Sequence, residues 1–351
     1  MDKVEQGIII EKLCKPGKGI LAADESTGTI GKRFASINVE NNLENRTKYR
    51  NLLFTTPKLE EYISGVITYE ETLLQENEGK KLIEPLIEKD IVIGIKVDKG
   101  VKPLYGTEET VTQGLDDLDK RCKLYYDAGA RFAKWRAVLK IDCEKNLPSS
   151  IAIHENSVTL ARYASICQNN GLVPIVEPEI LMDGNHTIEK SKSVTINVLS
   201  SVYRELIKHN VDIEYTLLKP NMVRSGVNSN ETLDFSKIAK YTLKALQNTV
   251  PVCMPGIVFL SGGMSEIEAT TALNEINKNK CKKPWYLTFS FGRALQASVL
   301  NTWKGENINI KNAQNKLFLR ASANGQSTLG LYNGEDDFNL NENLHEINYV
   351  Y

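Results

Sequence analysis

Eight short apolar runs, separated by stretches long enough to form helices, recur along the 351 residues of this chain. Each run has the length of a buried strand, and the stretches between them carry apolar residues at helical spacing. The runs span residues 19–24, 65–70, 91–96, 130–136, 173–177, 214–220, 256–261 and 285–290. Strands that alternate with helices pack as a parallel sheet with right-handed crossovers. Eight such units favour a closed barrel over an open sheet, so we predict an α/β fold with a single (β/α)8 barrel.

Two of the intervening stretches show the helical pattern clearly. In residues 193–210, apolar side chains such as Val198 and Val202 recur every four positions, which places them on one helical face. Residues 157–170 behave similarly and stop at Gly171, a residue that suits the left-handed conformation that often closes a helix. We therefore expect a helix over each of these stretches.

The composition argues against several classes of protein. The 43 basic and 44 acidic residues nearly cancel, which gives no reason to expect nucleic acid or an anionic membrane as the main partner. No apolar stretch approaches the roughly 20 residues of a membrane span, and the charged start, residues 1–6, is not typical of a signal peptide. The 6 cysteines form no C-x-x-C pair and the 4 histidines are scattered, which predicts reduced thiols and no metal site. We expect a cytoplasmic protein that uses no metal or other cofactor.

Polar residues end nearly every apolar run. In barrels of this kind the functional site lies at the carboxyl ends of the strands. Each buried ionisable group costs desolvation free energy unless it is paired, so this many of them predict a ring of charge around one mouth. For any single member, a structural ion pair is the alternative. The set consists of Asp24, Glu70, Lys96, Lys134, Arg136, Glu177, Lys219, Ser261 and Ser290.

Lys219 has the clearest chemistry of this set. It ends the apolar part of the run 214–220, and Pro220 prevents the run from continuing within a central sheet. An amine at the buried end of a strand loses its proton more easily than one in water, and a neutral amine can form a Schiff base with a carbonyl group. A neighbouring cation favours the neutral amine further. Lys134, two strands away, is our candidate for that cation.

Two loops with glycines predict a phosphate site. Residues 260–263 follow the seventh run and residues 290–293 end the eighth. Glycines let backbone N–H groups approach an anion, and these two loops are the usual phosphate site of such barrels. Arg293 adds a permanently charged donor. The candidates for a second phosphate site, opposite the first, are Ser26, Thr29, Lys32, Arg33 and Lys96. Residues 24–29 fit the capped start of a helix equally well.

Seven segments, in order along the chain, resemble the class I (Schiff-base) fructose-1,6-bisphosphate aldolases. They extend over almost the whole chain: 17–28, 94–100, 128–136, 172–181, 217–223, 258–266 and 287–303. The resemblance implies reversible cleavage of the small-molecule sugar phosphate fructose 1,6-bisphosphate to dihydroxyacetone phosphate and glyceraldehyde 3-phosphate, without a metal. It also implies a homotetramer. Met264 and Phe291 stand where the family often has glutamine and tyrosine, which bears on fine specificity and not on the reaction.

The same resemblance implies a role for each site residue. Lys219 is the Schiff-base lysine, and Glu177 is the main proton carrier with Glu179 beside it. The residues around the reacting hydroxyl groups are Asp24, Lys134 and Arg136. The residues for one phosphate are Ser261, Gly262, Gly263, Ser290, Gly292 and Arg293, and those for the substrate and its other phosphate are Ser26, Thr29, Arg33 and Lys96. Tyr351 matches a tyrosine that folds over the mouth and assists proton exchange.

The end of the chain differs from the rest in composition. Residues 334–351 carry 5 acidic residues, no lysine or arginine and few apolar groups, which predicts a mobile segment. We therefore expect a catalytic barrel domain over residues 1–333 and a mobile acidic tail over residues 334–351. A frayed terminus is the simpler interpretation. The final Tyr-Val-Tyr and the resemblance favour a lid over the active-site mouth.

Two other functions stay open. A different Schiff-base barrel, such as a transaldolase, would transfer a group between sugar phosphates instead of releasing a free triose, and the two predicted phosphate sites argue against it. The second is a scaffold role, because aldolases of this family contact actin or the acidic tail of a membrane adhesin. The cations that would attract such a peptide are Lys32, Arg33, Lys96, Lys134 and Arg136. We expect this role, if present, in addition to catalysis.

Overall fold

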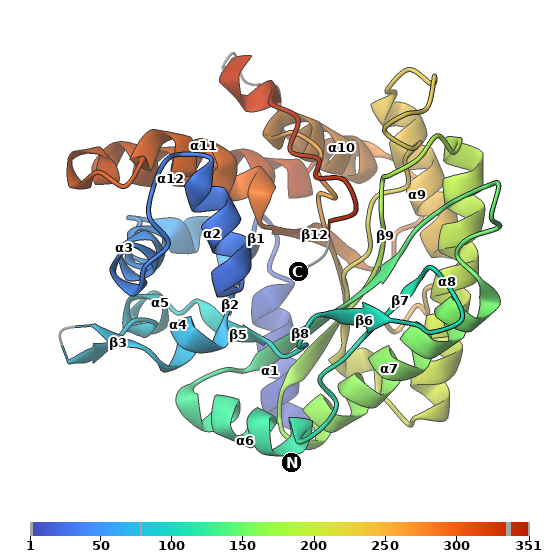
Figure 1. Ribbon diagram of the computed structural model, residues 1–351, viewed down its shortest axis with the longest axis horizontal. Coiled ribbons are helices and arrows are strands. Elements are labelled where there is room, and N and C mark those ends of the chain that lie inside the picture. Colours follow the sequence, from blue (N-terminus) through green and yellow to red (C-terminus); the bar gives the residue numbers. More distant parts are fainter. Residues whose placement is uncertain (1–2, 78, 335–337, 350–351) are drawn as a thin grey trace.

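The predicted apolar runs form the strands of one closed parallel barrel. A computed structural model describes residues 3–77, 79–334 and 338–349. The strands follow one another around the barrel in chain order, and the first closes on the last (Figure 1). They are β1 (Gly19–Ala23), β2 (Ile63–Thr68), β5 (Val92–Lys96), β8 (Phe132–Leu139), β9 (Val173–Ile180), β10 (Leu217–Leu218), β11 (Gly256–Phe259) and β12 (Tyr286–Phe291). The predicted (β/α)8 fold is therefore confirmed.

Helices surround the strands as an outer ring, except for α1, which lies across one end of the barrel (Figure 1). They are α1 (Lys3–Leu13), α2 (Thr27–Ala35), α3 (Leu43–Phe54), α4 (Glu70–Leu74), α5 (Glu84–Glu88), α6 (Leu118–Ala128), α7 (Ser150–Asn169), α8 (Ile188–Lys208), α9 (Phe235–Thr249), α10 (Glu266–Lys278), α11 (Arg293–Trp303) and α12 (Ile310–Thr328). The remaining elements are the short strands β3 (Glu76–Asn77), β4 (Lys80–Lys81), β6 (Val101–Pro103) and β7 (Thr110–Thr112), and the 3-10 helices Leu59–Glu61, Ile213–Tyr215, Asn307–Asn309 and Phe338–Asn341. No helix in the described part of the chain is long and apolar enough to cross a membrane.

The first helix closes the end of the barrel opposite the active-site mouth. Ile9, Ile10 and Leu13 of α1 form one buried cluster with inward-facing residues near the starts of the strands, such as Ile20 and Phe132. Burial of these side chains removes apolar surface from water and seals the barrel from below. Solvent and substrate therefore reach the barrel interior from the other end, where the strands finish.

Both predicted helices form, and both begin earlier than expected. The helix expected over residues 157–170 is α7, which begins at Ser150 because the hydroxyl of Ser149 accepts a hydrogen bond from the N–H of Ala152. The helix expected over residues 193–210 is α8, which is capped in the same way by Thr187. Polar capping residues set these starts, and an apolar pattern does not detect them.

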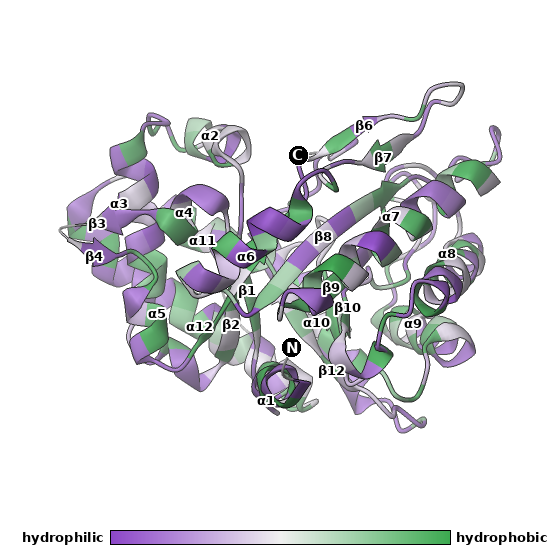
Figure 2. Cartoon of the chain, turned by 90° about the horizontal axis from the view of Figure 1, so that it is seen from below, coloured by the Kyte–Doolittle hydropathy of each residue, from purple (hydrophilic) through white to green (hydrophobic). Residues whose placement is uncertain are grey.

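Two strands run past the charged residues that were expected to end them. Lys134 and Arg136 lie inside β8, and Glu177 and Glu179 lie inside β9. In Figure 2, which is coloured by hydropathy, a hydrophilic stretch interrupts the otherwise apolar β8 at the centre of the molecule. Residues two apart in a strand face the same side, so the two strands present opposite charges side by side, with Arg136 in register with Glu177. The expectation that Lys134, Arg136 and Glu177 end their strands is wrong, because mutual pairing allows ionised groups within the sheet.

The last described segment, residues 338–349, returns to the mouth of the barrel. In Figure 1 its red ribbon descends from beside α10 toward the centre of the ring. Its backbone is held there by a hydrogen bond from Asn348 N to Asp183 Oδ1 at 2.8 Å and by one from Arg136 Nη2 to the carbonyl oxygen of Tyr349 at 2.9 Å. The division into a barrel over residues 1–333 and a mobile tail over residues 334–351 stays a prediction.

Candidate active site

Lys219 and Glu177 lie in direct contact at the floor of the mouth. The Nζ atom of Lys219 is 3.1 Å from Oε1 of Glu177, and the Nζ atom of Lys134 is 3.6 Å from the other oxygen, Oε2. All three side chains are buried. Lys219 follows β10, whose last residue pairs with Val176 of β9, and this pairing brings the amine beside Glu177. The predicted neighbourhood of Lys134 and Lys219 takes the form of two amines that share one carboxylate.

Two aspartates complete the charge balance of this floor. Asp24, immediately after β1, has Oδ2 at 2.8 Å from the Nζ atom of Lys134. Asp98 has Oδ1 at 2.6 Å from the Nζ atom of Lys96 and Oδ2 at 4.0 Å from that of Lys134. Burial opposes the charge of Asp24, but Lys134, Lys219 and Lys96 together lower its pKa to about 2. Burial likewise opposes the charge of Asp98, and Lys96 and Lys134 lower its pKa.

The floor is therefore an interlocked network of three lysines and three carboxylates. Opposite charges in contact stabilise one another where water is excluded, and they also fix the positions of the side chains. Lys134 occupies the central position, because it faces all three carboxylates, and the two oxygens of Glu177 link it to Lys219. A proton moved between Glu177 and Lys219 travels across one contact, which suits acid–base chemistry at a group bound to that amine.

The rim of the mouth carries a second ion pair, covered by the tail. Arg136 is paired with the carboxylate of Glu179. Burial opposes the charge of Glu179, but Arg136, aided by Arg293, lowers its pKa. The ring of Tyr349 lies between two guanidinium groups, with its centroid 5.2 Å from Arg136 and 4.2 Å from Arg293. The tail thus covers cations that would otherwise face solvent at the entrance.

The cavity left beneath the tail measures only about 50 Å³. Its lining includes most of the predicted site: Asp24, Arg33, Glu177, Glu179, Lys219, Ser261, Gly262, Ser290, Gly292 and Arg293, together with Tyr349. Pockets that bind small molecules generally enclose about 300–1,000 Å³. The conformation with the tail in place is therefore too full to hold a sugar bisphosphate.

The two glycine loops have the backbone that a close approach requires. Gly262 and Gly263 have φ angles of 61° and 95°, in the left-handed region that residues other than glycine rarely adopt. A Cβ at Gly263 would also lie 2.8 Å from the Cα of His345 in the tail. Glycine is therefore needed at this point both for the turn after β11 and for the passage of the tail across it.

Comparison with known proteins agrees with this geometry. The family described as "Fructose-bisphosphate aldolase class-I" matches residues 5–351. A cytosolic fructose-bisphosphate aldolase of Arabidopsis thaliana is 58% identical over 340 residues, which cover 96% of this chain and 86% of the relative. A fructose-bisphosphate aldolase of Dictyostelium discoideum is 56% identical over 340 residues, covering 96% and 95%.

The chain belongs to the class I fructose-bisphosphate aldolase family. It is an enzyme, and its reaction class is that of a lyase. A solved structure of the fructose-bisphosphate aldolase of Plasmodium falciparum superposes with a TM-score of 0.93 at 53% identity, covering 95% of this chain and 96% of that one. That structure is a ternary complex with TRAP and a small-molecule inhibitor.

Several predicted site residues of this aldolase lie away from the cavity. Ser26 caps α2 and its hydroxyl lies 2.9 Å from that of Thr29, so both serve the helix start in this conformation. Lys96 faces Asp98 in the floor and not the rim. Glu70 lies at the start of α4, where its carboxylate pairs with Lys99 at 3.2 Å, outside the predicted ring of charge. Tyr351 lies outside the described residues.

Sequence reasoning missed three residues of this aldolase that the structure brings to the site. Asp98 lies between two floor lysines, and its signal was present as a second charged residue two positions after Lys96. Glu25 pairs with Arg33 and lies 2.6 Å from Arg50, so it holds the rim arginine from behind. The final Tyr-Val-Tyr indicated Tyr349 as part of a lid, but only Tyr351 was assigned a role there. Among the described residues, no group of three His, Cys, Asp or Glu side chains is arranged to hold a metal ion.

Proposed function

We propose that this enzyme cleaves fructose 1,6-bisphosphate reversibly through a covalent Schiff base on Lys219. The observation that carries the proposal is the contact of 3.1 Å between the buried amine of Lys219 and Glu177, at the floor of a mouth lined by cations. A buried amine beside a carboxylate that can exchange its proton is the arrangement that imine formation requires. The rim arginines supply charge of the sign that the substrate phosphates need.

The chemistry begins with attack of the neutral amine on the ketone carbon, C2, of the open-chain sugar. A C–N bond forms, the carbonyl oxygen becomes a hydroxyl group, and Glu177 supplies the proton with which that hydroxyl group leaves as water. The product is a protonated imine. Glu177, ionised again once it has given its proton to the leaving water, accepts the proton of the hydroxyl group on C4, and the C3–C4 bond breaks as its electron pair moves into the imine. Glyceraldehyde 3-phosphate leaves and an enamine stays on Lys219.

Protonation of the enamine at C3 and addition of water then release dihydroxyacetone phosphate and regenerate the amine. We assign to Asp24, Lys134 and Arg136 the positioning of the reacting hydroxyl groups, because Asp24 lines the cavity, and Lys134 and Arg136 contact its lining carboxylates Glu177 and Glu179. Glu179 holds Arg136 in place. No resident metal or cofactor enters the proposed steps.

The phosphates would bind at the rim. Ser261, Gly262, Ser290, Gly292 and Arg293 line one side of the cavity, and Arg33 lines it as well. Burial opposes the charge of Arg33, but Glu25 and the hydroxyl of Tyr349 raise its pKa well above the ordinary value, so it stays a cation. Ser26, Thr29, Lys96 and Gly263 would join the substrate only if their present contacts rearranged.

The tail would act as a lid. Since the ring of Tyr349 occupies the space between the two rim arginines, substrate binding requires residues 344–349 to move, and their return would exclude water. Tyr351 remains our candidate for proton exchange on the enamine. This proposal keeps the division into a barrel over residues 1–333 and a tail over residues 334–351.

Borohydride reduction tests the assignment of Lys219. The enzyme is incubated with dihydroxyacetone phosphate, reduced, digested and analysed by peptide mass spectrometry. The adduct is expected on the peptide that contains Lys219, and labelling of Lys134 or Lys96 instead would overturn the mechanism. Activity that a chelator abolishes would count equally against it.

A scaffold role is a second candidate, supported by the complex of the Plasmodium falciparum relative with TRAP. In this chain, Lys32, Arg33 and Arg293 line a cleft of about 340 Å³ beside the acidic tail residues Glu342 and Glu346. An acidic peptide, from an adhesin tail or from actin, would occupy the place of this segment by charge complementarity. The test is competition: if fructose 1,6-bisphosphate fails to displace a bound acidic peptide, the two sites do not overlap.

We also propose the location and the assembly of the enzyme by similarity. Relatives from Arabidopsis thaliana and Cicer arietinum are named cytosolic or cytoplasmic isozymes, which supports a cytoplasmic location for this enzyme. A homotetramer stays a prediction of family membership. Sedimentation of the purified protein would decide it, with a monomer as the outcome that contradicts it.

A further inference from the structure

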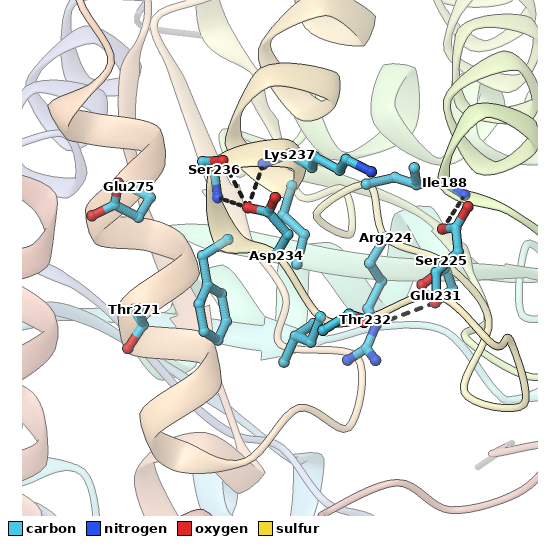
Figure 3. Close-up of a pocket in the computed structure, with 13 residues that line it drawn as sticks. Ile188, Arg224, Ser225, Glu231, Thr232, Asp234, Ser236, Lys237, Thr271 and Glu275 are labelled. Carbon is cyan, nitrogen blue, oxygen red and sulfur yellow. Dashed lines mark hydrogen bonds between the residues drawn. The ribbon is translucent and has the colours of Figure 1, made fainter.

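A pocket of about 700 Å³ lies outside the barrel mouth (Figure 3). It is enclosed by the loop that follows Lys219, by the first turns of α8 and α9, and by the side of α10. Its lining residues are Ile188, Arg224, Ser225, Glu231, Thr232, Leu233, Asp234, Phe235, Ser236, Lys237, Ile238, Thr271 and Glu275. This set and the lining of the active-site cavity share no residue. The volume is within the range of small-molecule sites.

Arg224 is a charged group in this pocket that lacks a carboxylate partner. Within the described parts of the chain, its hydrogen bonding consists of one bond from Nε to the carbonyl oxygen of Ser225 at 3.3 Å, and it forms no ion pair. Burial lowers the pKa of Arg224, and the charge of Glu268 offsets this effect only in part. The side chain is partly exposed to the pocket, so an anion that enters the pocket would gain charged hydrogen bonds from its unused N–H donors.

The carboxylates of the pocket are committed elsewhere. Glu231 accepts a hydrogen bond from the N–H of Ile188 at 3.1 Å, and Asp234 accepts three, at 2.9, 2.7 and 3.1 Å, from the first turn of α9. Glu275 lies 3.4 Å from the Nζ atom of Lys278. In Figure 3 the guanidinium group of Arg224 lies apart from all three of these carboxylates. Its terminal nitrogens are therefore available to a ligand.

The charges of the pocket limit what that ligand can be. Arg224 and Lys237 supply two positive charges, and Glu231, Asp234 and Glu275 supply three negative ones, so the lining has a net charge of 2 − 3 = −1. This balance opposes a multiply charged phosphate and tolerates one negative group placed on Arg224. The apolar part of the wall suits an apolar body, since Ile188 and Ile238 are buried and Leu233 and Phe235 are half-buried.

We propose that this pocket binds a small monocarboxylic acid with an apolar body. Its carboxylate accepts hydrogen bonds from both terminal nitrogens of Arg224, an arrangement that the planar guanidinium favours. Its apolar part packs on Leu233 and Phe235. This site is separate from the catalytic one, and it stands whether or not the Schiff-base mechanism does.

Calorimetric titration of the intact protein with benzoate tests the proposal. We expect saturable binding at millimolar concentration to the wild-type protein and to Arg293→Ala, which alters only the active-site rim. Arg224→Ala should weaken binding about tenfold or more, the loss expected for a charged hydrogen-bonded pair. Arg224→Lys, which keeps the charge but not the planar fork, should fall between. Arg204→Ala, which removes the same charge from an exposed position on α8, is the matched control and should bind like wild type.

Each outcome decides the matter. No saturable binding to the wild-type protein, or binding lost in Arg293→Ala and kept in Arg224→Ala, would overturn the site. A parallel titration with inorganic phosphate should lose affinity in Arg293→Ala alone, and loss in Arg224→Ala instead would overturn the choice of a monocarboxylate.

A second variant guards against misfolding. If Arg224→Ala fails to fold, Leu233→Asp provides the test, because Leu233 is a half-buried residue of the pocket wall. The new carboxylate should abolish benzoate binding by repulsion, while the rate of sugar cleavage stays at the wild-type value. Unchanged benzoate affinity in folded Leu233→Asp would remove the carboxylate from this pocket.

Discussion

The floor and the rim of the mouth differ in what stabilises their charged side chains. On the floor, Lys219, Lys134 and Glu177 belong to a network in which each charge contacts another charge of opposite sign, all on or next to strands. At the rim, the ring of Tyr349 lies between Arg136 and Arg293. The segment that covers these cations is distant in sequence, since the hydrogen bond from Arg136 to the carbonyl oxygen of Tyr349 spans 213 positions. Permanent partners complete the floor, whereas at the rim Arg136 keeps its ion pair with Glu179 and the removable tail covers the cations from outside.

This difference separates the chemistry from the binding. Charges paired within a sheet cannot move without large loss of stability, so the floor is prepared for proton transfer before substrate arrives. Cations that a tyrosine ring and a backbone carbonyl cover are exchanged more readily, because such contacts are weaker than ion pairs. Substrate phosphates would replace the tail at the rim and leave the floor unchanged. Each prediction below disturbs one side of this comparison.

Removing the amine of the floor should have the largest effect. Lys219→Met is expected to lower kcat by at least about a thousandfold, the scale seen when a covalent nucleophile is lost. Steady-state assays with fructose 1,6-bisphosphate measure this effect, and circular dichroism shows whether the fold survives. Substantial residual cleavage in a folded variant would mean that another group forms the Schiff base.

Removing a cation of the rim should affect binding more than chemistry. Arg293→Ala is expected to raise KM through the loss of about 2–3 kcal/mol of charged hydrogen bonding to a phosphate. Arg293→Lys keeps the charge without the planar fork and should lose less. An unchanged KM in Arg293→Ala would remove this residue from the phosphate site.

The free energy of unfolding at acid pH should depend on the charges of the floor. The pKa of Asp24 is depressed to about 2, so its ionised form stabilises the folded state above the unfolded pKa and loses this contribution as the pH falls from near 4 toward 2. The shift corresponds to roughly 2 kcal/mol. Urea unfolding of wild type and Asp24→Asn should show a gap at neutral pH that narrows through this window. If the difference in unfolding free energy between the two proteins stays constant with pH, the ion pair of Asp24 with Lys134 does not stabilise the fold.

Removing the ring of Tyr349 from the rim should have the smallest effect and should lower KM. Tyr349→Ala removes two cation–ring contacts, each worth about 0.5–1 kcal/mol at exposed sites, so KM should fall severalfold because the open form is more populated. Ile347→Ala, at a tail position that is 79% exposed, is the control and should leave KM unchanged. A rise in KM for Tyr349→Ala would mean that the ring helps to hold substrate instead of competing with it.

The sequence predicted the barrel and the floor better than the rim. Local patterns were sufficient for strands such as β1 and β12, because a short apolar run between turns carries its own signal, and the charge at Lys134 or Lys219 was visible against it. Helix starts escaped because Ser149 and Thr187 act through single capping bonds outside the apolar pattern. The final Tyr-Val-Tyr pointed to a lid, but the contacts of Tyr349 with Arg136 and Arg293 were not predicted because they join distant parts of the chain and no local pattern indicates them. Lys96 is a different case: its partner Asp98 is two positions away and visible in the sequence, but the resemblance had assigned Lys96 to the substrate.

A crystal structure of the enzyme soaked with dihydroxyacetone phosphate tests the account most directly. The account predicts a covalent bond between Nζ of Lys219 and C2 of the ligand, with Glu177 still beside that nitrogen and residues 344–349 displaced from Arg136 and Arg293. A ligand bound in the mouth with the Lys219 amine unbonded, or a bound phosphate with the tail still between the two arginines, would contradict it.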